Sequence, residues 1–362
     1  MEKPPVFTDE DLDRTLGLGG IWDRGYLGSG ITIGLIDTGV KEIPELGDVV
    51  IKTQNCVQDE DPASLQSDHG TAMALCIHCI APRSKLVSFK VFPTHDKALW
   101  FRKNDQVRRA VTDALDFCIE HYPRIRVVNL SLAIPRTLIH PCSPQNPCSV
   151  CQSIQRAHDA GIVVVAAAGN SGPKPDTIEC PGRAQGAITV GASLNAENTA
   201  YYRRHGDPDG RYGTSYSCAY ITGGVALLLS ACPEATPEEI RLALKCTARP
   251  LPGEPPNAQG AGQARLDRAL VALIGPSQET YQKAHRQLYA LSGNPDAQNT
   301  ANDYFTQPLE LALSYIEKSL INRGLMEDGA KALQEIMSYL VPGRSPSYES
   351  KISELLHRTD QP

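Results

Sequence analysis

The sequence predicts an α/β protein: a three-layer α/β/α domain with a mostly parallel sheet, followed by a small all-α module. Two observations indicate this class. Between about residues 30 and 270, short β-rich runs alternate with helical patterns, as in a layered α/β domain with right-handed crossovers. The β-rich runs are also almost continuously apolar, which is typical of parallel strands covered on both faces.

Each element follows from a local pattern. Strands are expected at residues 31–36, 86–92, 127–132, 162–167 and 187–190. Helices are expected at 69–78, 105–120, 150–160 and 215–229. A further helix has a clear start, because Thr236 can cap it, Pro237 suits its first turn and Glu239 completes a capping box.

The domain boundary is expected at residue 275. Residues 1–275 would form the α/β domain, and residues 276–362 a helical module rich in Gln, Glu, Lys, Leu and Tyr. The module's helices are expected at 277–291, 307–323, 328–340 and 347–357. Their apolar residues would form either the module's own core or a docking face for a protein partner, with an own core favoured because short helices must bury something to fold.

Composition excludes several classes of protein. The chain of 362 residues is 41% hydrophobic and 21% charged, which favours a substantial core over global disorder. Its net charge of -6 disfavours a role in nucleic-acid binding. Apolar runs are too short for a signal peptide or a membrane span, so we expect a cytoplasmic protein with no membrane partner.

Three short motifs supply the groups that make a serine nucleophilic. They are Asp37-Thr38-Gly39, His69-Gly70-Thr71 and Gly213-Thr214-Ser215. A serine needs a neutral imidazole to accept its proton and a carboxylate to orient that imidazole. Asp37 is expected at the carboxyl end of a parallel strand, where ligands bind, and His69 and Ser215 would each begin a helix. Asn170 carries a side-chain amide suited to an oxyanion.

Each motif also has a simpler interpretation. Asp-Thr-Gly occurs in aspartic proteases, but that mechanism needs a second such carboxylate, and no second motif of this kind is present. Ser215 could be an ordinary helix cap and His69 a structural histidine. The combination of all three motifs in this order, together with Asn170, favours the catalytic interpretation.

The flanks of these motifs resemble those of the subtilisin-like serine protease family, the subtilases. The similar segments are IGLIDTGV, DHGTAMA, AAAGNSGP and GTSYSCAYITGG, and the resemblance covers residues 16–274. It implies a serine endopeptidase that works through an acyl-enzyme and needs no cofactor. The substrate would be a peptide or protein.

The resemblance also implies roles for single residues. Ser215 would be the nucleophile, His69 the general base and then acid, and Asp37 the orienting carboxylate. Asn170 would donate to the oxyanion together with the backbone amide of Ser215. An extended substrate would pair with the backbone of Ser131, Leu132 and Ala133. The first specificity pocket would be lined by Ala167, Ala168 and Gly169.

The chain departs from the family in its serine helix and in the segment before it. Tyr216 and Tyr220 are bulkier than the usual residues, from which we expect altered packing rather than lost chemistry. Between residues 191 and 213 the usual motifs are replaced by a short segment that includes Tyr201. A wall of the substrate cleft could therefore be rebuilt. The alternative function is a catalytically inactive module that binds a peptide or a partner protein.

Three further departures give expectations of their own. The histidine helix runs directly to Ala81-Pro82 without the loop that many relatives use for calcium, so we expect no calcium there. Only 36 residues precede Asp37, so we expect folding without a prodomain. Ala133 replaces a common glycine, and its methyl group could narrow the first pocket.

A third possible function is that of a maturation protease that recognises one precursor through residues 276–362.

Cysteines cluster in one region of the sequence. Cys142, Cys148 and Cys151 are spaced Cys-x5-Cys-x2-Cys, and Cys180 follows in what would be a loop near the pocket. Four thiolates could hold a structural zinc ion that pins the loops of the substrate cleft. Disulfides and free thiols fit the same spacing, so the sequence leaves these three states open.

Overall fold

The structure of the protein is a computed structural model. It describes residues 9–57, 60–61, 64–65, 67–94, 104–134, 142–143, 145–172, 177–193, 213–251 and 256–274. The expected helices of residues 276–362 lie outside this range, so the helical module and its boundary stay predictions. Contacts divide the chain into two units, Met1–Ile240 and Arg241–Pro362, and the sheet lies in the first.

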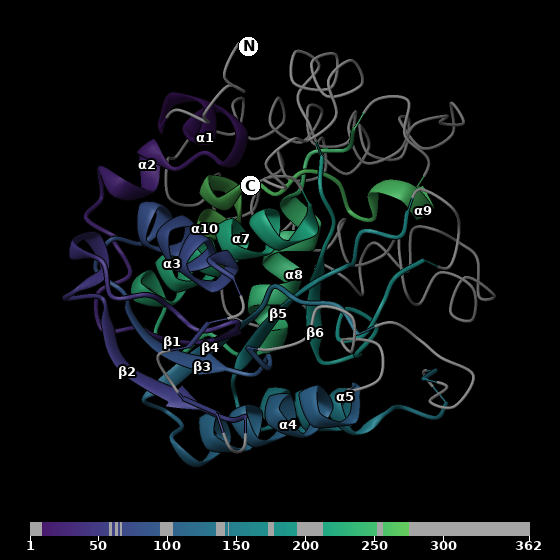
Figure 1. The fold of residues 1–362 in the computed structure, drawn as a ribbon. Coiled ribbons are helices and arrows are strands. Elements are labelled where there is room, and N and C mark those ends of the chain that lie inside the picture. Colours follow the sequence, from purple (N-terminus) through teal and green to yellow (C-terminus); the bar gives the residue numbers. More distant parts are fainter. Residues whose placement is uncertain are drawn as a thin grey trace, which may run out of the picture. The chain divides into compact units, whose positions relative to one another are not determined.

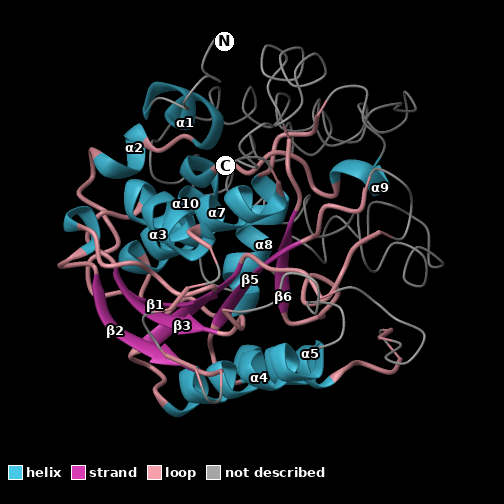
Figure 2. Cartoon of the chain, viewed as in Figure 1, coloured by secondary structure: helices cyan, strands magenta, loops and turns pink. Residues whose placement is uncertain are grey.

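The centre of the first unit is a six-stranded sheet in the order β2-β3-β1-β4-β5-β6, and every strand pair in it is parallel (Figures 1 and 2). The strands are β1 (Thr32–Asp37), β2 (Val50–Asn55), β3 (Lys85–Lys90), β4 (Ile125–Leu130), β5 (Val163–Ala167) and β6 (Ala187–Val190). The chain order reverses between the neighbours β1 and β4. In open α/β sheets, ligands bind at the carboxyl ends of the strands beside such a reversal.

Helices cover both faces of this sheet. Figure 1 shows α3 (His69–Ile80) and α7 (Thr214–Ala231) on one face, and α4 (Asn104–Glu120) and α5 (Ser149–Asp159) on the other. The three-layer α/β/α prediction is therefore confirmed. Within residues 31–229, the predicted helices and five predicted strands are present with shifts of one to two residues at most of their ends, as expected for frayed termini.

Smaller elements complete the described chain. They are α1 (Asp9–Leu16), α2 (Gly19–Trp22), a 3-10 helix (Pro44–Leu46), α8 (Pro237–Thr247), α9 (Pro256–Gln259) and α10 (Leu266–Leu273). The capping box before α8 is as predicted: Thr236 N–H donates to Glu239 Oε2 at 2.8 Å, and Glu239 N–H donates back to the Thr236 hydroxyl at 3.3 Å. None of the described helices has the length and apolar character needed to cross a bilayer.

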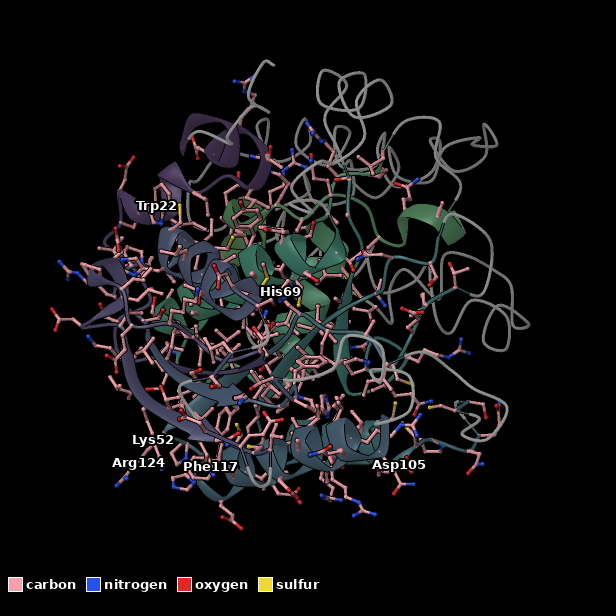
Figure 3. The ribbon with its side chains drawn as sticks, viewed as in Figure 1. Trp22, Lys52, His69, Asp105, Phe117 and Arg124 are labelled. Atoms are coloured by element: carbon pink, nitrogen blue, oxygen red, sulfur yellow. The ribbon has the colours of Figure 1, made fainter. Side chains whose placement is uncertain are left out.

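Apolar packing fixes the sheet between its helices. Leu35 and Ile36 of β1 are fully buried, as are Val127 and Val128 of β4. On the sheet face covered by α4, the Phe117 ring of α4 packs edge-on against Phe89 of β3 at a centroid distance of 5.4 Å. The Lys52 ammonium of β2 lies 4.4 Å from the Phe117 ring centre, and both residues are labelled in Figure 3. These contacts pack α4 against β2 and β3, and β3 pairs with β1, the strand that Asp37 ends.

Candidate active site

Asp37 and His69 form the centre of the site. Asp37 is the last residue of β1, and its side chain is only 1% exposed. His69 is the first residue of α3, and its Nδ1 lies 2.8 Å from Asp37 Oδ1 (His69 is labelled in Figure 3). A carboxylate accepts this hydrogen bond, so it fixes the tautomer with the proton on Nδ1. The other ring nitrogen, Nε2, is then the basic one.

The electrostatics of this pair favour a charged imidazole. Burial alone lowers the pKa of His69, but the hydrogen bond to Asp37 and the negative charge of that carboxylate outweigh it, so the pKa is raised. Asp37 Oδ1 also accepts a hydrogen bond from Thr38 N–H at 2.7 Å. Asp37 Oδ2 is buried and finds no hydrogen-bond partner among the described residues. The carboxylate therefore depends on His69 for the compensation of its buried charge.

Local backbone packing explains why His69 begins its helix at this point. Gly70 N–H donates to the Thr38 hydroxyl at 2.9 Å, so the first turn of α3 is tied directly to the residue after Asp37. A Cβ atom at Gly70 would collide with the carbonyl oxygen of Gly39. The glycine thus permits the close approach of two backbones that brings the imidazole to the carboxylate.

Ser215 lies beside the carboxyl end of β4, the strand next to β1. It is the second residue of α7, and its hydroxyl donates to the carbonyl of Ser131 at 3.1 Å. In return, the Ser131 hydroxyl donates to the carbonyl of Ser215 at 2.8 Å. Ser131 directly follows β4, the sheet neighbour of β1. The two strand ends therefore place Ser215 and the Asp37–His69 pair at one edge of the sheet.

Asn170 is oriented by the residue before Ser215. Its Oδ1 accepts hydrogen bonds from Thr214 N–H at 3.0 Å and from the Thr214 hydroxyl at 3.2 Å. Because Oδ1 is engaged, the amide presents its Nδ2 donor. Gly213 has φ 149°, and a Cβ there would lie 2.9 Å from Asn170 Nδ2, so a glycine is needed where the chain passes this amide.

The segments expected to bind substrate lie beside these residues. Ser131, Leu132 and Ala133 follow β4, while Ala167 ends β5 and is followed by Ala168 and Gly169. Glu179 N–H donates to the Ala168 carbonyl at 3.0 Å, and a Cβ on Gly169 would contact the Glu179 carboxyl group at 2.6 Å. The expected pocket therefore has an acidic neighbour that the sequence did not single out.

A buried polar contact holds α7 on β4. Asn129 Nδ2 donates to the Thr222 hydroxyl at 2.8 Å and approaches Cys218 Sγ at 3.4 Å. Burial raises the pKa of Cys218 to about 12, so this thiol stays neutral and does not compete with Ser215 as a nucleophile. Asn129 and Thr214 were missed as positioning residues, because only their contacts with distant parts of the chain reveal their roles.

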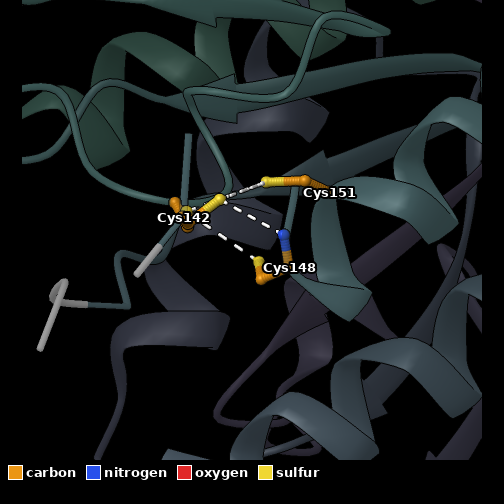
Figure 4. Close-up of side chains that lie close together, drawn as sticks. Cys142, Cys148 and Cys151 are labelled. Carbon is orange, nitrogen blue, oxygen red and sulfur yellow. Dashed lines mark hydrogen bonds between the residues drawn. The ribbon is translucent and has the colours of Figure 1, made fainter. Parts of the chain in front are cut away.

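The four clustered cysteines also come together. Cys142, Cys148 and Cys151 lie side by side where α5 begins (Figure 4), and Cys180 completes the group. Their four sulfur atoms lie within 4.8 Å of one another. The substitutions around Tyr201, which were expected to alter the cleft, lie outside the described residues. The Tyr220 side chain is hydrogen-bonded to Cys76 of α3, and the expectation that Tyr220 alters the packing relative to the family stays a prediction.

This fold, with an aspartate–histidine pair and a serine at the carboxyl edge of a parallel sheet, is the arrangement expected of an α/β serine peptidase. Comparison with known proteins agrees. The family model described as "Subtilase family" matches residues 28–210 and 204–262. Subtilisin DY of Bacillus licheniformis is 26% identical over an alignment that covers 62% of this chain and 86% of the relative. Serine protease AprX of Bacillus subtilis is 24% identical over an alignment that covers 67% of this chain and 66% of AprX.

The solved structures agree on the fold. A structure of the MycP3 protease from the type VII (ESX-3) secretion system is 22% identical and covers 74% of this chain and 89% of its own, with a TM-score of 0.57. The chain belongs to the subtilase family and is a subtilisin-like serine endopeptidase.

Proposed function

We propose that the protein hydrolyses peptide bonds with a triad of Asp37, His69 and Ser215, with Asn170 as an oxyanion donor. The observation that carries the proposal is the 2.8 Å hydrogen bond between His69 Nδ1 and Asp37 Oδ1, because it leaves Nε2 as the free base. Neither residue needs this arrangement to fold a helix or a strand. A buried carboxylate whose partners are one histidine and one backbone N–H is costly, and catalysis accounts for its presence.

The reaction begins at Ser215. Its hydroxyl, which donates to the Ser131 carbonyl in the structure, turns to His69 Nε2 for the reaction, since catalytic hydrogen bonds often tighten only in the substrate complex. Ser215 Oγ attacks the substrate carbonyl carbon while Nε2 takes the hydroxyl proton. Nε2 then gives that proton to the leaving amine, and an acyl-enzyme remains. Water repeats the two steps and releases the acid product.

Charge that develops on the substrate oxygen meets two donors. One is Asn170 Nδ2, held in place because Thr214 occupies Oδ1 of the same amide. The other is the Ser215 backbone N–H in the first turn of α7, where a helix also stabilises negative charge. The backbone of residues 131–133 would pair with the extended substrate. This chemistry requires no cofactor.

The test is hydrolysis of a casein or peptide-library substrate by purified full-length protein and by Ser215→Ala. Turnover should fall by about 10⁶-fold, the magnitude known from subtilisin itself when its serine or histidine is removed. Ser217→Ala is the matched control, because it removes a half-buried hydroxyl from the same helix, and it should keep at least half of the activity. Equal activity of wild type and Ser215→Ala would reject the triad.

Two further proposals concern where the enzyme acts and what it recognises. We propose a cytoplasmic location. Fractionation of cells of the source organism tests this location, since the protein should remain with the cytosol and not in the medium.

We also propose that the enzyme recognises one protein precursor through residues 276–362. Removal of residues 276–362 tests this recognition: hydrolysis of short peptides should persist and cleavage of the precursor should stop. A truncated protein that cleaves the precursor normally would contradict it.

A further inference from the structure

We propose that Cys142, Cys148, Cys151 and Cys180 bind one zinc ion through four thiolates. This site is separate from the triad and takes no part in the peptide-bond chemistry. Its sulfur atoms come from three places in the chain: the segment before α5, the first turn of α5, and the loop between β5 and β6.

The sulfur spacing fits a single tetrahedral centre. Sγ of Cys151 lies 3.6 Å from that of Cys142 and 3.7 Å from that of Cys180, and the Cys148 and Cys180 sulfurs are 4.0 Å apart. A regular tetrahedron with zinc–sulfur bonds of about 2.3 Å has sulfur atoms about 3.8 Å apart along each edge. Two disulfides would instead pair the four sulfurs at about 2.0 Å within each pair. Cys151 and Cys180 each approach more than one other sulfur, which suits a shared ion rather than pairwise bonds.

The surroundings shield most of the site from water and place it at the N-terminus of a helix. Cys142, Cys151 and Cys180 are buried and pack in the same apolar cluster as Ile134, Val150 and other core residues. Cys148 is the N-cap residue of α5 and Cys151 lies in its first turn, where the helix stabilises negative charge. Cys148 N–H also donates to Cys142 Sγ at 3.4 Å (Figure 4), which helps to disperse the charge of a zinc-bound sulfur.

The ligand set also selects the metal. Four sulfur ligands with no carboxylate suit a thiophilic tetrahedral ion such as zinc, and do not suit calcium or magnesium. Four protein ligands leave no open position for water, so such a zinc is structural rather than catalytic.

The ion would tie together the two segments expected to bind substrate. Cys180 forms an isolated antiparallel bridge with Ile134, whose N–H donates to the Cys180 carbonyl at 2.6 Å, just beyond Ala133. The backbone N–H of the adjacent Glu179 donates a hydrogen bond to the Ala168 carbonyl. Zinc would therefore fix both walls of the cleft from outside. This consequence rests on the proposed function, whereas the metal site itself does not.

The test begins with the metal content of full-length protein purified without chelators, in reducing buffer, and measured by mass spectrometry of the elements. We expect about one equivalent of zinc per chain. Titration with an organomercurial, which caps thiolates, should release that zinc into a colorimetric indicator. The released zinc should rise in step with thiol capping, and this experiment needs no variant that has to fold.

Variants locate the ion. Cys148→Ser and Cys180→Ser should each reduce zinc to below a tenth of an equivalent, while Cys79→Ser, an exposed cysteine of α3, should keep it. Zinc below a tenth of an equivalent in wild type, iron in its place, or an intact mass lower by two hydrogens per disulfide would each overturn the proposal. Labelling of Ser215 by an active-site probe is measured separately, so loss of the metal site and loss of the triad are distinguishable.

Discussion

At the scale of single residues, the proton on His69 sets the pH dependence. The base must be neutral to accept the Ser215 proton, and Asp37 raises the pKa of His69 against the effect of burial. In wild type, kcat/KM should therefore rise with pH through this raised pKa. In Asp37→Asn only the burial effect remains, so the acid limb of the profile should move to lower pH. The rate at the plateau should fall by about 10⁴-fold, because the imidazole loses its orienting carboxylate.

The measurement is a pH–rate profile of both proteins with one peptide substrate. Asp68→Asn is the control, because it removes an exposed carboxylate from the residue next to His69 and should shift the limb much less. An acid limb that stays in place in Asp37→Asn would mean that a group other than His69 is the base.

Specificity is also argued at this scale. The Glu179 carboxyl group covers Gly169, and its Oε1 accepts a hydrogen bond from the Ser171 hydroxyl at 2.8 Å. If residues 167–169 line the first pocket, that pocket should prefer Lys or Arg. In Glu179→Gln the preference should fall about tenfold, since a hydrogen bond to a charged group contributes about 1.5 kcal/mol or more. Profiling with a peptide library measures this, and an unchanged preference for basic residues would exclude Glu179 as its source.

At the scale of elements, an ion pair between a fully buried lysine and a partly exposed glutamate secures the strand beside Asp37. Lys90 ends β3 and is fully buried, and its ammonium donates to Glu60 Oε2 at 3.0 Å, to the Asp61 carbonyl and to the Thr94 hydroxyl. Glu60→Gln should lower the free energy of unfolding by about 3 kcal/mol, because it leaves a buried charge without its counter-charge. Lys90 keeps the Asp61 carbonyl and the Thr94 hydroxyl as acceptors, so the loss of stability should lie at the lower end of the range of about 3–5 kcal/mol known for broken buried pairs. Urea denaturation measures it.

The same pair contributes to acid sensitivity. Burial raises the pKa of Glu60, but hydrogen bonds from Thr94 and Lys90 and the lysine charge outweigh it and lower that pKa. A carboxyl group with a lowered pKa stabilises the fold above its unfolded pKa, and the stability is lost as pH falls through the folded value. The variant should thus lose less stability on acidification than wild type does. Glu45→Gln, an exposed change, should behave like wild type throughout.

Elements also show how far the sequence predicts the fold. Buried strands such as β5, with the sequence VVVAA, are recognisable because every residue is apolar. The strand β2 was missed, because its sequence VIKTQN is largely polar and none of its residues is buried at the edge of the sheet. This segment is a strand because it pairs with β3, and its own residues do not predict that pairing.

The site divides in the same way. The aspartate, histidine, serine and asparagine lie in short motifs with recognisable flanks, so the sequence indicates them. The contact between Ser131 and Ser215 joins residues 84 positions apart, and that between Asn170 and Thr214 joins residues 44 apart. Local patterns carry no information on such contacts. Glu179 was missed for the same reason, since only the fold brings it to Gly169.

At the scale of the whole molecule, the link between α3 and β3 bears on ion binding. The four residues 81–84 make this link, and Ser84 N–H closes it by donating to the Ala81 carbonyl at 3.0 Å. We expect that calcium, or its removal with a calcium-selective chelator, leaves the melting temperature unchanged within about one degree. The chelator must spare zinc, because a general chelator would also act on the cysteine cluster. A calcium-dependent rise of several degrees would contradict the expectation.

The central claim is that the whole fold assembles a working nucleophile and base. The most direct measurement is labelling of full-length protein by a fluorophosphonate probe, which reacts only with an activated serine. Wild type should be labelled, Ser217→Ala should be labelled equally, and Ser215→Ala and His69→Ala should not. A folded wild-type protein that resists the probe, or a Ser215→Ala variant that is still labelled, would contradict the account.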